Sequence, residues 1–539
     1  MTNPQVLIVG GSLNGLTAAL LLARYGIRCT VVERHPNTTV QYKLRGLSPR
    51  SMEIYRAAGV EHEIRSHRTG DQKGGEIARV PNLASPNVQF LGMPWADMSD
   101  LSAVTAETCD QDVLEPILRA HAKRLGAEMR FDTEVLSLRA GEREVVCRVR
   151  NNRTGAEESI AADYVLACDG VAGKSREALG IGRHGPGILQ HWMNLIFSCD
   201  LEPYLQGKRF TACFVTDING SLVPREDRWL LALQYDPQRG ERPQDFDAER
   251  TRALVRKAAG RDDVRVELYD ARSWDVGAYV ADRFGAGRVF IAGDAAHAMP
   301  PTGGFGGNTG IQDVHNLAWK LALVLRGAAS PELLDTYDSE RRPIAEATLG
   351  QALARLSAWF KDLGRQLPKP DALVADDAVT FGATYRDGAF LDDGDGDAPF
   401  EDPRAPTGRP GTRAPHVTLA RRGRQVAVHD LVDDGFLLLG NEGARVWEAA
   451  ARSIAPTVKV KLDTCIAKST DSAAVARLEQ AYGLDKDGAV LIRPDGIIAW
   501  RSRGAAGRDP ERALRAVLHD LLGRPPARRP RTQPLEHRL

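Results

Sequence analysis

The sequence has no excess of charge of either sign, and it has no long apolar run. Lysine plus arginine and aspartate plus glutamate number 71 each, which removes any general electrostatic argument for a nucleic-acid or membrane-surface partner. No apolar run approaches the roughly 18 residues of a membrane-spanning helix, and the first apolar strand starts too early to leave room for a signal peptide. We therefore expect a cytoplasmic protein that acts on small molecules, without nucleic-acid or membrane partners.

The chain also lacks any paired-cysteine motif. Its seven cysteines are scattered, odd in number and free of a C-x-x-C pair. This distribution favours reduced thiols over a disulfide framework or a zinc site, and we predict no metal. With 539 residues the chain is too long for one ordinary core, so two or three domains are expected.

What the chain does have begins at its N-terminus. The apolar run Val6–Val9 stops at a glycine-rich turn, apolar residues then recur at helical spacing up to Tyr25, and a second run, Cys29–Val32, ends at Glu33. This order predicts strand, tight turn, helix and strand, which is the first βαβ unit of a nucleotide-binding sheet.

The glycines and the acid of this unit have distinct predicted roles. Gly10 permits the turn, Gly15 lets the helix pack close to the strand, and the N–H groups at the helix start would face a pyrophosphate. Glu33 suits a ribose with a free 2′-hydroxyl. Ser12 replaces the middle glycine of G-x-G-x-x-G, which slightly hinders the approach of a phosphate. Taken alone, the motif is explained about equally well by a glycine turn in an ordinary βαβ unit.

Two later strands also deliver a carboxylate to their ends. An apolar run ends at Asp169-Gly170, where the acid could bind a ligand or cap the next helix. Another ends at Gly293-Asp294 and leads through a glycine-dense loop into a helix expected to begin near Thr309. His297 and His315 flank this loop, but neither accompanies a nucleophile or a metal-ligand spacing, so we interpret both as structural.

In their order and spacing, these three segments resemble the single-component FAD-dependent aromatic hydroxylases of the para-hydroxybenzoate hydroxylase type. Among them, the chain is most similar to actinobacterial aromatic-polyketide hydroxylases. The motifs span about residues 4–350. The resemblance implies an α/β fold: a Rossmann-like FAD-binding domain of the glutathione-reductase type, an interleaved antiparallel-sheet substrate domain, and a C-terminal thioredoxin-like domain.

The resemblance also implies roles for individual residues. Arg45 and Gln111 would approach the pyrophosphate and ribityl region, although the residues alone favour a solvated Arg45. Val135 would touch adenine through its backbone, and Asp294 would bond the ribityl chain. The implied cofactor-binding residues are Gly10, Ser12, Leu13, Asn14, Gly15, Glu33, Arg34, Arg45, Gln111, Val135, Asp169, Asp294, Gly303, Gly306, Gly307 and Asn308. The implied catalytic loop beside the flavin, with no side-chain base assigned, comprises Pro300, Pro301, Gly306 and Gly307.

The segment from Gly185 to Leu268 alternates apolar and polar residues, as antiparallel strands with one buried face do. In the family it forms a sheet over the flavin. Together its candidate substrate residues would line an apolar slot for a planar polycyclic ligand, although core packing could explain any one of them. The candidates are Trp95, Trp192, Asn194, Phe214, Trp229 and Gln234.

The resemblance and the composition together predict the domain bounds. The expected order is an FAD-binding domain at 1–75, 100–184 and 270–386, a substrate sheet at 76–99 and 185–269, a linker at 387–415, a thioredoxin-like domain at 416–523 and a disordered tail at 524–539. In the C-terminal part we expect strands at 426–439, 458–462 and 489–500 and helices at 473–481 and 510–522. Without a C-x-x-C pair, this domain would be structural or oligomerising, which leaves a homodimer open.

The resemblance implies that NADPH or NADH reduces the FAD and that O2 then forms a C4a-hydroperoxyflavin, which hydroxylates an aromatic polyketide in secondary metabolism. Three alternatives stay open from the sequence. The enzyme could carry out Baeyer–Villiger insertion or oxidative rearrangement of a polyketide quinone, or it could inactivate an antibiotic. From a different class, the chain could be a flavin-binding scaffold without turnover.

Overall fold

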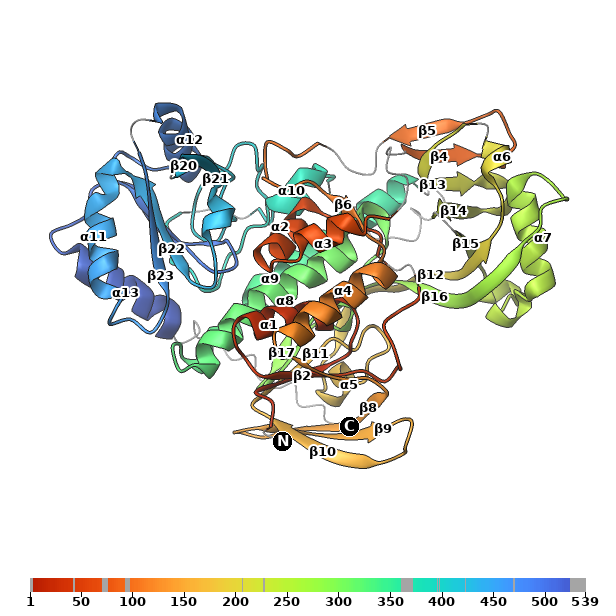
Figure 1. Cartoon of the computed structure of the whole chain (residues 1–539), viewed down its shortest axis with the longest axis horizontal. Helices are drawn as coiled ribbons and strands as arrows, with labels where there is room; N and C mark the ends of the chain where they lie inside the picture. Colours follow the sequence, from red (N-terminus) through yellow and green to blue (C-terminus); the bar gives the residue numbers. More distant parts are fainter. Residues whose placement is uncertain are drawn as a thin grey trace, which may run out of the picture.

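A computed structural model of the chain describes residues 3–41, 44–69, 76–92, 97–205, 207–225, 228–359, 372–394, 396, 398–421, 423–468 and 471–523. The molecule is elongated. A six-stranded sheet and its helices form the centre, an eight-stranded sheet lies at one end, and a four-stranded sheet lies at the other (Figure 1). It is a mixed α/β protein.

The central sheet has the order β17-β18-β11-β1-β2-β7, and all its pairs are parallel except β17 with β18. The predicted strand, helix and strand at the N-terminus are β1, α1 and β2. The bounds are β1 Val6–Val9, α1 Leu13–Arg24, β2 Cys29–Val32, β7 Glu128–Arg130, β11 Tyr164–Ala167, β17 Gly285–Ala286 and β18 Val289–Ile291.

Both faces of this sheet are covered, which explains its continuous apolar strands. Along β1, Val6 and Ile8 pack in the helical core, whereas Leu7 and Val9 pack in a separate cluster with a three-stranded antiparallel sheet. That small sheet consists of β8 (Thr133–Ala140), β9 (Val145–Asn151) and β10 (Glu157–Ala162). The helical layer contains α2 (Pro49–Ala57), α3 (Glu61–Ser66), α4 (Gln111–Arg124), α8 (Phe305–Leu325) and α9 (Thr336–Trp359), with the short pair β3 (Gly46–Leu47) and β6 (Glu107–Thr108) beside it.

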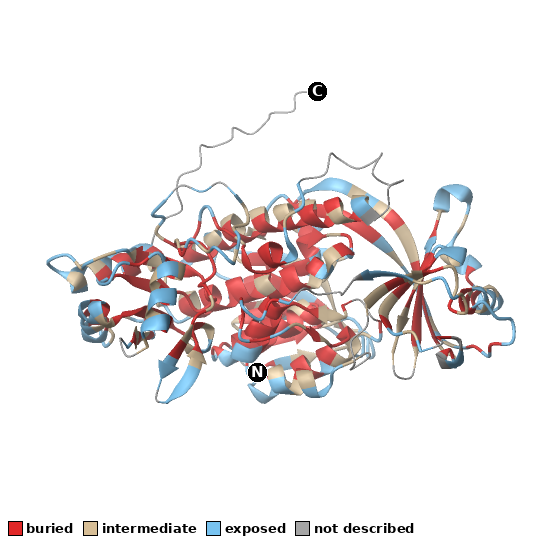
Figure 2. Cartoon of the chain, turned by 90° about the horizontal axis from the view of Figure 1, so that it is seen from above, coloured by how far each residue is buried: buried red, intermediate tan, exposed pale blue. Residues whose placement is uncertain are grey.

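Burial is concentrated in the central helices (Figure 2). Helix α8 is buried over most of its length and packs against both α1 and α9. None of the described helices is both long and apolar enough to cross a bilayer. The prediction of unpaired cysteines is confirmed, because all seven are free.

The eight-stranded sheet has the order β19-β16-β12-β15-β14-β13-β4-β5, and α7 covers one of its faces (Figure 1). Its two long strands, β12 and β16, run from the central body outward. The bounds are β4 Glu76–Val80, β5 Gln89–Gly92, β12 Arg183–Ser198, β13 Phe210–Val215, β14 Gly220–Pro224, β15 Trp229–Tyr235, β16 Glu267–Ala281 and β19 His297–Ala298; the helices nearby are α5 Ser175–Ala178, α6 Glu202–Leu205 and α7 Ala248–Ala259.

The C-terminal sheet has the order β23-β22-β24-β25, with β22 and β23 parallel and the other pairs antiparallel. Residues of β22 point alternately into two clusters, one with α11 and α13 and one with α12, so helices cover both faces. The bounds are α10 Asp376–Phe381, β20 Thr418–Arg421, β21 Arg424–Ala427, β22 Phe436–Asn441, α11 Arg445–Ile454, β23 Leu462–Ala467, α12 Ser472–Tyr482, β24 Ala489–Ile492, β25 Ile498–Ser502 and α13 Pro510–Gly523.

Several local predictions in this part need correction. The strand predicted at 426–439 is interrupted by a 3₁₀ turn at Val428–Leu431, and the strand predicted at 489–500 is broken by the turn at Asp495-Gly496. Helix α11 was not predicted. The segment 387–415 was expected to bury little, yet Phe390, Thr412 and Ala414 within it are buried. It packs along the seam between the central helices and the C-terminal sheet.

Candidate cofactor and substrate site

Four neighbouring parallel strands end at one edge of the central sheet. β2 is followed by Glu33, β1 by Gly10, β11 by Cys168 and Asp169, and β18 leads to Asp294. Because the four strands are adjacent and parallel, their carboxyl ends form one row. Open parallel sheets bind ligands at this edge. The residues predicted from three distant motifs are therefore brought together.

The turn after β1 has no room for side chains. Gly10 has a φ of +104°, and a Cβ there would overlap the carbonyl oxygen of Cys168. A Cβ at Gly15 would overlap the carbonyl oxygen of Gly10. The two glycines therefore let the turn pass close to β11 and let α1 begin directly against it.

Ser12, the departure from the glycine pattern, is bound sideways to α4. Its hydroxyl donates to Glu115 Oε1 and accepts from Gln111 Nε2 at 3.0 Å. Although Ser12 is the N-cap of α1, its side chain makes no capping hydrogen bond to the described helix. The first-turn N–H groups of α1 are thus left for a ligand, and an anion is the ligand that a helix start prefers.

Asn14 joins the first motif to the third. A Cβ added to Gly293, at the end of β18, or to Gly310, on α8, would collide with the Asn14 amide group. A side chain at either position would therefore displace Asn14, and Gly293 also has a positive φ of 59°, which favours glycine. This contact was not found from the sequence, because no local pattern shows which residue faces a glycine from a distant segment.

The acids at the strand ends differ in what they bind. Glu33 accepts hydrogen bonds from the backbone N–H groups of Gly11 (2.7 Å) and His35 (2.9 Å). Asp169 accepts from the Ser175 N–H at 3.0 Å through Oδ2, while its Oδ1 is buried with no partner among the described residues. Asp294 is exposed between buried neighbours. Asp169 thus holds the loop before α5 with one oxygen, while the other has no protein partner among the described residues.

Helix α8 starts at Phe305 rather than near Thr309 as predicted, and Gly303 and Gly304 precede it with positive φ angles of 82° and 65°. The Asn308 side chain fixes this first turn. Its Oδ1 accepts from Ser48 N (2.9 Å) and Ser51 Oγ (2.6 Å), and its Nδ2 donates to the carbonyls of Gly46 and Gly304. Ser48 is the N-cap of α2, and its side chain accepts from Ser51 N.

Gly306 and Gly307, both on the first turn of α8, have different surroundings. A Cβ on Gly307 would come within 2.8 Å of the Leu44 side chain, which would have to shift to make room for it. A Cβ on Gly306 would approach only Met299, at 3.5 Å, which is ordinary contact. Packing within the described protein therefore does not explain the glycine at 306. Nearby, Pro300 is buried and Pro301 is exposed.

The remaining predicted cofactor residues fall into two groups. Gln111 Oε1 accepts from Leu44 N (3.1 Å), so Gln111 connects the Arg45 loop to the glycine turn, and Arg45 Nη2 donates to the carbonyl of Pro224 at 2.9 Å. Arg34 is exposed and Val135 is half-buried on β8. The first pair therefore lies at the junction of the central body with the eight-stranded sheet.

The two histidines of the third motif are buried. His297 Nε2 lies 2.6 Å from Asp313 Oδ2, and Arg341 Nε donates to Asp313 Oδ1 at 2.9 Å. Burial alone would raise the pKa of Asp313, but the charges of His297 and Arg341 outweigh it and lower the pKa. The triad links β19, α8 and α9, which agrees with the structural interpretation of His297.

Four of the candidate substrate residues share one face of the eight-stranded sheet. Trp192 pairs with Gln234, and Asn194 and Phe214 lie in the next cross-strand row, on the face opposite the α7 core. Trp229 instead lies in that core and packs on Phe210, with ring centroids 6.4 Å apart. Trp95 lies outside the described residues.

Sequence reasoning missed Trp274, on β16. Its ring stacks on Trp192 at 6.2 Å between centroids, and its Nε1 donates to Asn194 Oδ1 at 2.8 Å. The register of β12 with β16 brings the two tryptophans together. An alternating pattern shows which residues share a face of one strand, but it does not show which strand pairs with it.

The residues at the edge fit FAD on three observations: a glycine turn without room for a Cβ, an uncapped α1 start, and a buried Asp169 oxygen without a described partner. They define a site for a dinucleotide cofactor.

Comparisons with known proteins agree with this class. Residues 3–352 match the FAD binding domain family, and residues 407–525 match the aromatic-ring hydroxylase, C-terminal family. The aklavinone 12-hydroxylase RdmE of Streptomyces purpurascens is 38% identical, with 96% of this chain and 99% of that protein covered. A 4-methyl-5-nitrocatechol 5-monooxygenase of Burkholderia is 37% identical, with coverage of 96% and 97%.

A crystal structure of aklavinone-11 hydroxylase with FAD and aklavinone superposes with a TM-score of 0.89 at 35% identity, covering 97% of this chain and 100% of that one. The chain belongs to the FAD-dependent aromatic-ring hydroxylases and is a flavoprotein monooxygenase with FAD as its cofactor.

Proposed function

We propose that this monooxygenase uses a reduced nicotinamide nucleotide and O2 to add one oxygen atom to a planar polycyclic aromatic polyketide. The observation that carries this proposal is the pairing of two surfaces: the row of strand ends that fits FAD, and the sheet face that carries the stacked Trp192 and Trp274. The relatives named for aklavinone supply the substrate class.

Each part of the edge has a proposed role in holding the cofactor. The N–H groups at the start of α1 would bind the pyrophosphate, Glu33 would accept a hydrogen bond from a ribose hydroxyl, and Asp294 would accept hydrogen bonds from the ribityl hydroxyls. The first turn of α8 would present its N–H groups to the flavin ring, and packing among the described residues does not require the glycine at 306. Bound FAD supplies the redox chemistry that activates oxygen, and the protein supplies position and exclusion of water.

The proposed substrate face combines flat apolar rings with a few polar groups. Trp192 and Trp274 give a stacking surface, and Asn194 and Gln234 give amides that can orient hydroxyl or carbonyl groups. Asn194 Oδ1 already accepts from Trp274, which leaves its N–H groups as donors toward a ligand. We assign no side-chain base. The proposed substrate is therefore an aromatic ring that is already electron-rich enough to react with the activated oxygen.

We also propose the domain bounds given above, with a Rossmann-like FAD-binding domain and a thioredoxin-like C-terminal domain. The mixed four-stranded sheet with helices on both faces supports the latter. Its single cysteine, Cys465, is buried, and burial raises the pKa of the thiol. We therefore propose a structural or oligomerising role, which includes a homodimer, and no thiol redox chemistry.

The test is anaerobic reduction of the FAD-loaded protein by NADPH or NADH, followed through flavin absorbance, with and without candidate substrates. The panel contains anthraquinones, naphthacenes and a single-ring nitrocatechol. We expect a polycyclic compound to accelerate reduction and, after admission of O2, to give a product heavier by one oxygen atom. Faster reduction with the nitrocatechol alone would replace the polycyclic substrate class with a single-ring one.

Product structure separates the reaction types. A new ring hydroxyl supports hydroxylation, whereas an ester or a rearranged ring supports oxygen insertion into a polyketide quinone. If FAD binds but neither nicotinamide nucleotide reduces it with any compound, the monooxygenase proposal fails in favour of a flavin-binding scaffold.

A further inference from the structure

A small polar pocket lies at the seam between the central helices and the C-terminal part of the chain. It is lined by Arg50 of α2, by Gln312, His315 and Asn316 of α8, and by Arg413 and Asp495 from the C-terminal side. The pocket has space for one or two water molecules. It is separate from the strand-end site, and none of the residues assigned to FAD or substrate lines it.

Two arginines at this pocket share one carboxylate. Arg50 Nη1 donates to Glu53 Oε2 at 2.9 Å, and Arg413 donates to the same carboxylate through Nε (3.2 Å) and Nη2. All three residues are buried. Asp495 gives Arg50 only its backbone carbonyl, at 2.6 Å from Nη2. Two guanidinium charges are thus balanced by one negative charge.

The carboxylate of Asp495 is used elsewhere. It accepts from Arg493 through Nε (2.9 Å) and Nη2, and Glu340 accepts from Arg493 Nη1 (2.7 Å) and from Lys320 Nζ (2.9 Å). Two cations and two carboxylates therefore neutralise each other in this neighbouring group. Arg50 and Arg413 carry two positive charges, and Glu53 is the one carboxylate among the described residues that bond to them. One positive charge therefore remains uncompensated. Burial of such a charge costs several kcal/mol unless something pairs with it.

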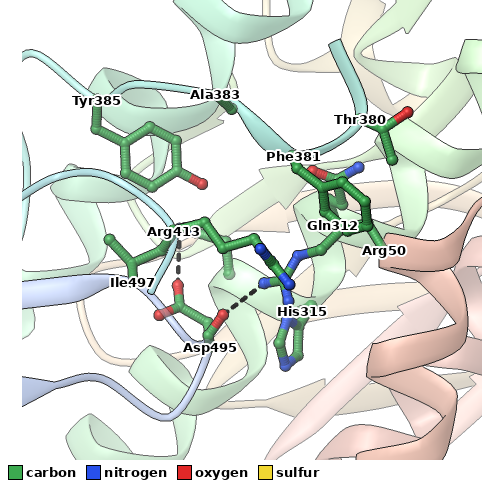
Figure 3. A pocket seen from close by; sticks show the side chains of 11 residues that line it. Arg50, Gln312, His315, Thr380, Phe381, Ala383, Tyr385, Arg413, Asp495 and Ile497 are labelled. Atoms are coloured by element: carbon green, nitrogen blue, oxygen red, sulfur yellow. Dashed lines mark hydrogen bonds between the residues drawn. The ribbon is translucent and has the colours of Figure 1, made fainter. Parts of the chain in front are cut away.

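The pocket wall also offers hydrogen-bond donors. Burial and the charge of Arg50 lower the pKa of His315 to about 3, so the imidazole is neutral and carries one N–H. His315 is buried and Gln312 is half-buried, and both line the pocket. Figure 3 shows the two guanidinium groups meeting above the ring of His315, with Gln312 beside Phe381.

One acceptor also faces this region. Asn316 Oδ1 is buried without a described partner, while its Nδ2 donates toward Glu340 and Asp495. Asn316 Oδ1 needs a hydrogen-bond donor. An anion in the pocket would not supply one, but a water molecule beside the anion would donate to this oxygen. The space in the pocket suffices for one small ion with one water molecule.

We propose that this pocket binds a small monovalent anion of halide size, with Arg50 and Arg413 supplying the charge and His315 and Gln312 supplying hydrogen bonds. Chloride is the anion of this class that is abundant around proteins. Because the two arginines come from the central body and the C-terminal part, the bound ion stabilises the seam between them.

The first test uses the full-length, FAD-loaded protein in sodium gluconate, with chloride or bromide replacing gluconate at constant ionic strength. A ligand that binds only the folded state raises Tm as its concentration increases. Above its Kd, this rise becomes proportional to the logarithm of the ligand concentration. We expect this rise with both halides in a gluconate background, since gluconate is too large for the pocket. A Tm that does not depend on halide would overturn the proposal.

Bromide also locates the site. In crystals grown or soaked with bromide, an anomalous peak is expected between Arg50, Arg413 and His315. Bromide peaks confined to the protein surface would mean that any stabilisation comes from adventitious ions only, which refutes the pocket.

A variant provides an internal replacement for the ion. Gln312→Glu places a carboxylate in the pocket, so we expect Tm to lose its halide dependence and, without halide, to equal or exceed that of the parent. Gln425→Glu makes the same chemical change at an exposed position on β21 and should keep the parent's halide response. An unchanged halide response in Gln312→Glu would contradict the assignment. The bromide experiment on the parent protein decides the question if that variant does not fold.

Discussion

At the scale of single residues, the glycines of the loop before α8 and of its first turns occupy their positions for different physical reasons. A Cβ at Gly310 would displace the Asn14 side chain and one at Gly307 would displace Leu44, whereas no described protein atom lies close enough to exclude a Cβ at Gly306. The pattern of a glycine-rich loop thus combines packing within the protein with space kept for a ligand. Substitution by alanine separates the two.

Gly306→Ala and Gly310→Ala form a matched pair on α8. For Gly306→Ala we expect the apoprotein to keep its stability or gain up to about 1 kcal/mol, because alanine favours a helix, while FAD affinity falls by about tenfold or more. Gly310→Ala should instead destabilise the apoprotein by about 1–3 kcal/mol through overpacking on Asn14. FAD titration and denaturant unfolding of the apoprotein measure the two effects. Unchanged FAD affinity in Gly306→Ala would remove this residue from the proposed flavin site.

Ser12 gives a second prediction at this scale. Its hydroxyl bonds to Gln111 and to Glu115, which is itself buried. Ser12→Ala removes these bonds without adding bulk, so we expect a loss of about 1–2 kcal/mol of unfolding free energy with FAD affinity within about threefold. Urea denaturation and FAD titration test this. A large loss of FAD affinity at unchanged stability would show that the hydroxyl binds the cofactor directly.

At the scale of elements, buried histidines make stability depend on pH. His429 follows β21 in the 3₁₀ turn before β22, and its Nε2 lies 2.7 Å from the carbonyl oxygen of Ala414. Burial and the charge of Arg413 lower the pKa of His429 to about 3. In the unfolded chain its pKa is about 6.5, so the unfolded state binds the proton first as the pH falls. Stability contributed by the neutral form is therefore lost between about pH 6.5 and 3.

His429→Gln tests this dependence. We expect the variant to lose less unfolding free energy than the parent on going from pH 6.5 to 5, by up to about 1.4 kcal/mol per pH unit. His519→Gln, at an exposed position on α13, should leave the parent's pH profile unchanged. Chemical denaturation across this pH range measures the slopes. Equal slopes in parent and His429→Gln would show that this histidine is not kept neutral by the fold.

Elements that follow from the local pattern of apolar residues and glycines could be predicted from the sequence. Features that depend on which strands pair, and in which register, could not. The strand, helix and strand at the N-terminus follow from apolar runs separated by glycine, and so does the placement of acids at the strand ends. The sequence analysis named Trp229, which lies in the α7 core, and omitted Trp274, which stacks on Trp192, because the register of β12 with β15 and β16 decides which face each residue occupies.

At the scale of the whole molecule, the seam between the central helices and the C-terminal part is made of buried charges. Arg413 binds Glu53 of α2, and Arg493 binds Glu340 of α9, so each arginine joins two distant parts of the chain. No local pattern indicates these pairs, because the partners lie 360 and 153 positions apart in the chain. Residues that looked like a solvated linker, including Arg413, are instead part of the core.

Arg413 and Arg493 are both buried, but the removal of each leaves a different set of charges behind. Without Arg413, Arg50 and Glu53 still form a neutral pair. Without Arg493, two buried carboxylates, Glu340 and Asp495, face the single cation Lys320. Breaking a buried pair costs about 3–5 kcal/mol when a charge is left uncompensated, and much less when the remaining charges balance.

We therefore expect Arg493→Met to destabilise the protein by about 3–5 kcal/mol and Arg413→Met by about 1–2 kcal/mol, although both remove one buried guanidinium of the same size. Denaturant unfolding of the FAD-loaded variants measures the difference. Because Arg413→Met also removes the uncompensated charge at the pocket, its Tm should no longer respond to halide, whereas a variant at an exposed arginine, Arg452→Gln, should respond as the parent does. If Arg413→Met proved as costly as Arg493→Met, the charge balance assigned to the seam would be wrong, and Glu53 would need both arginines.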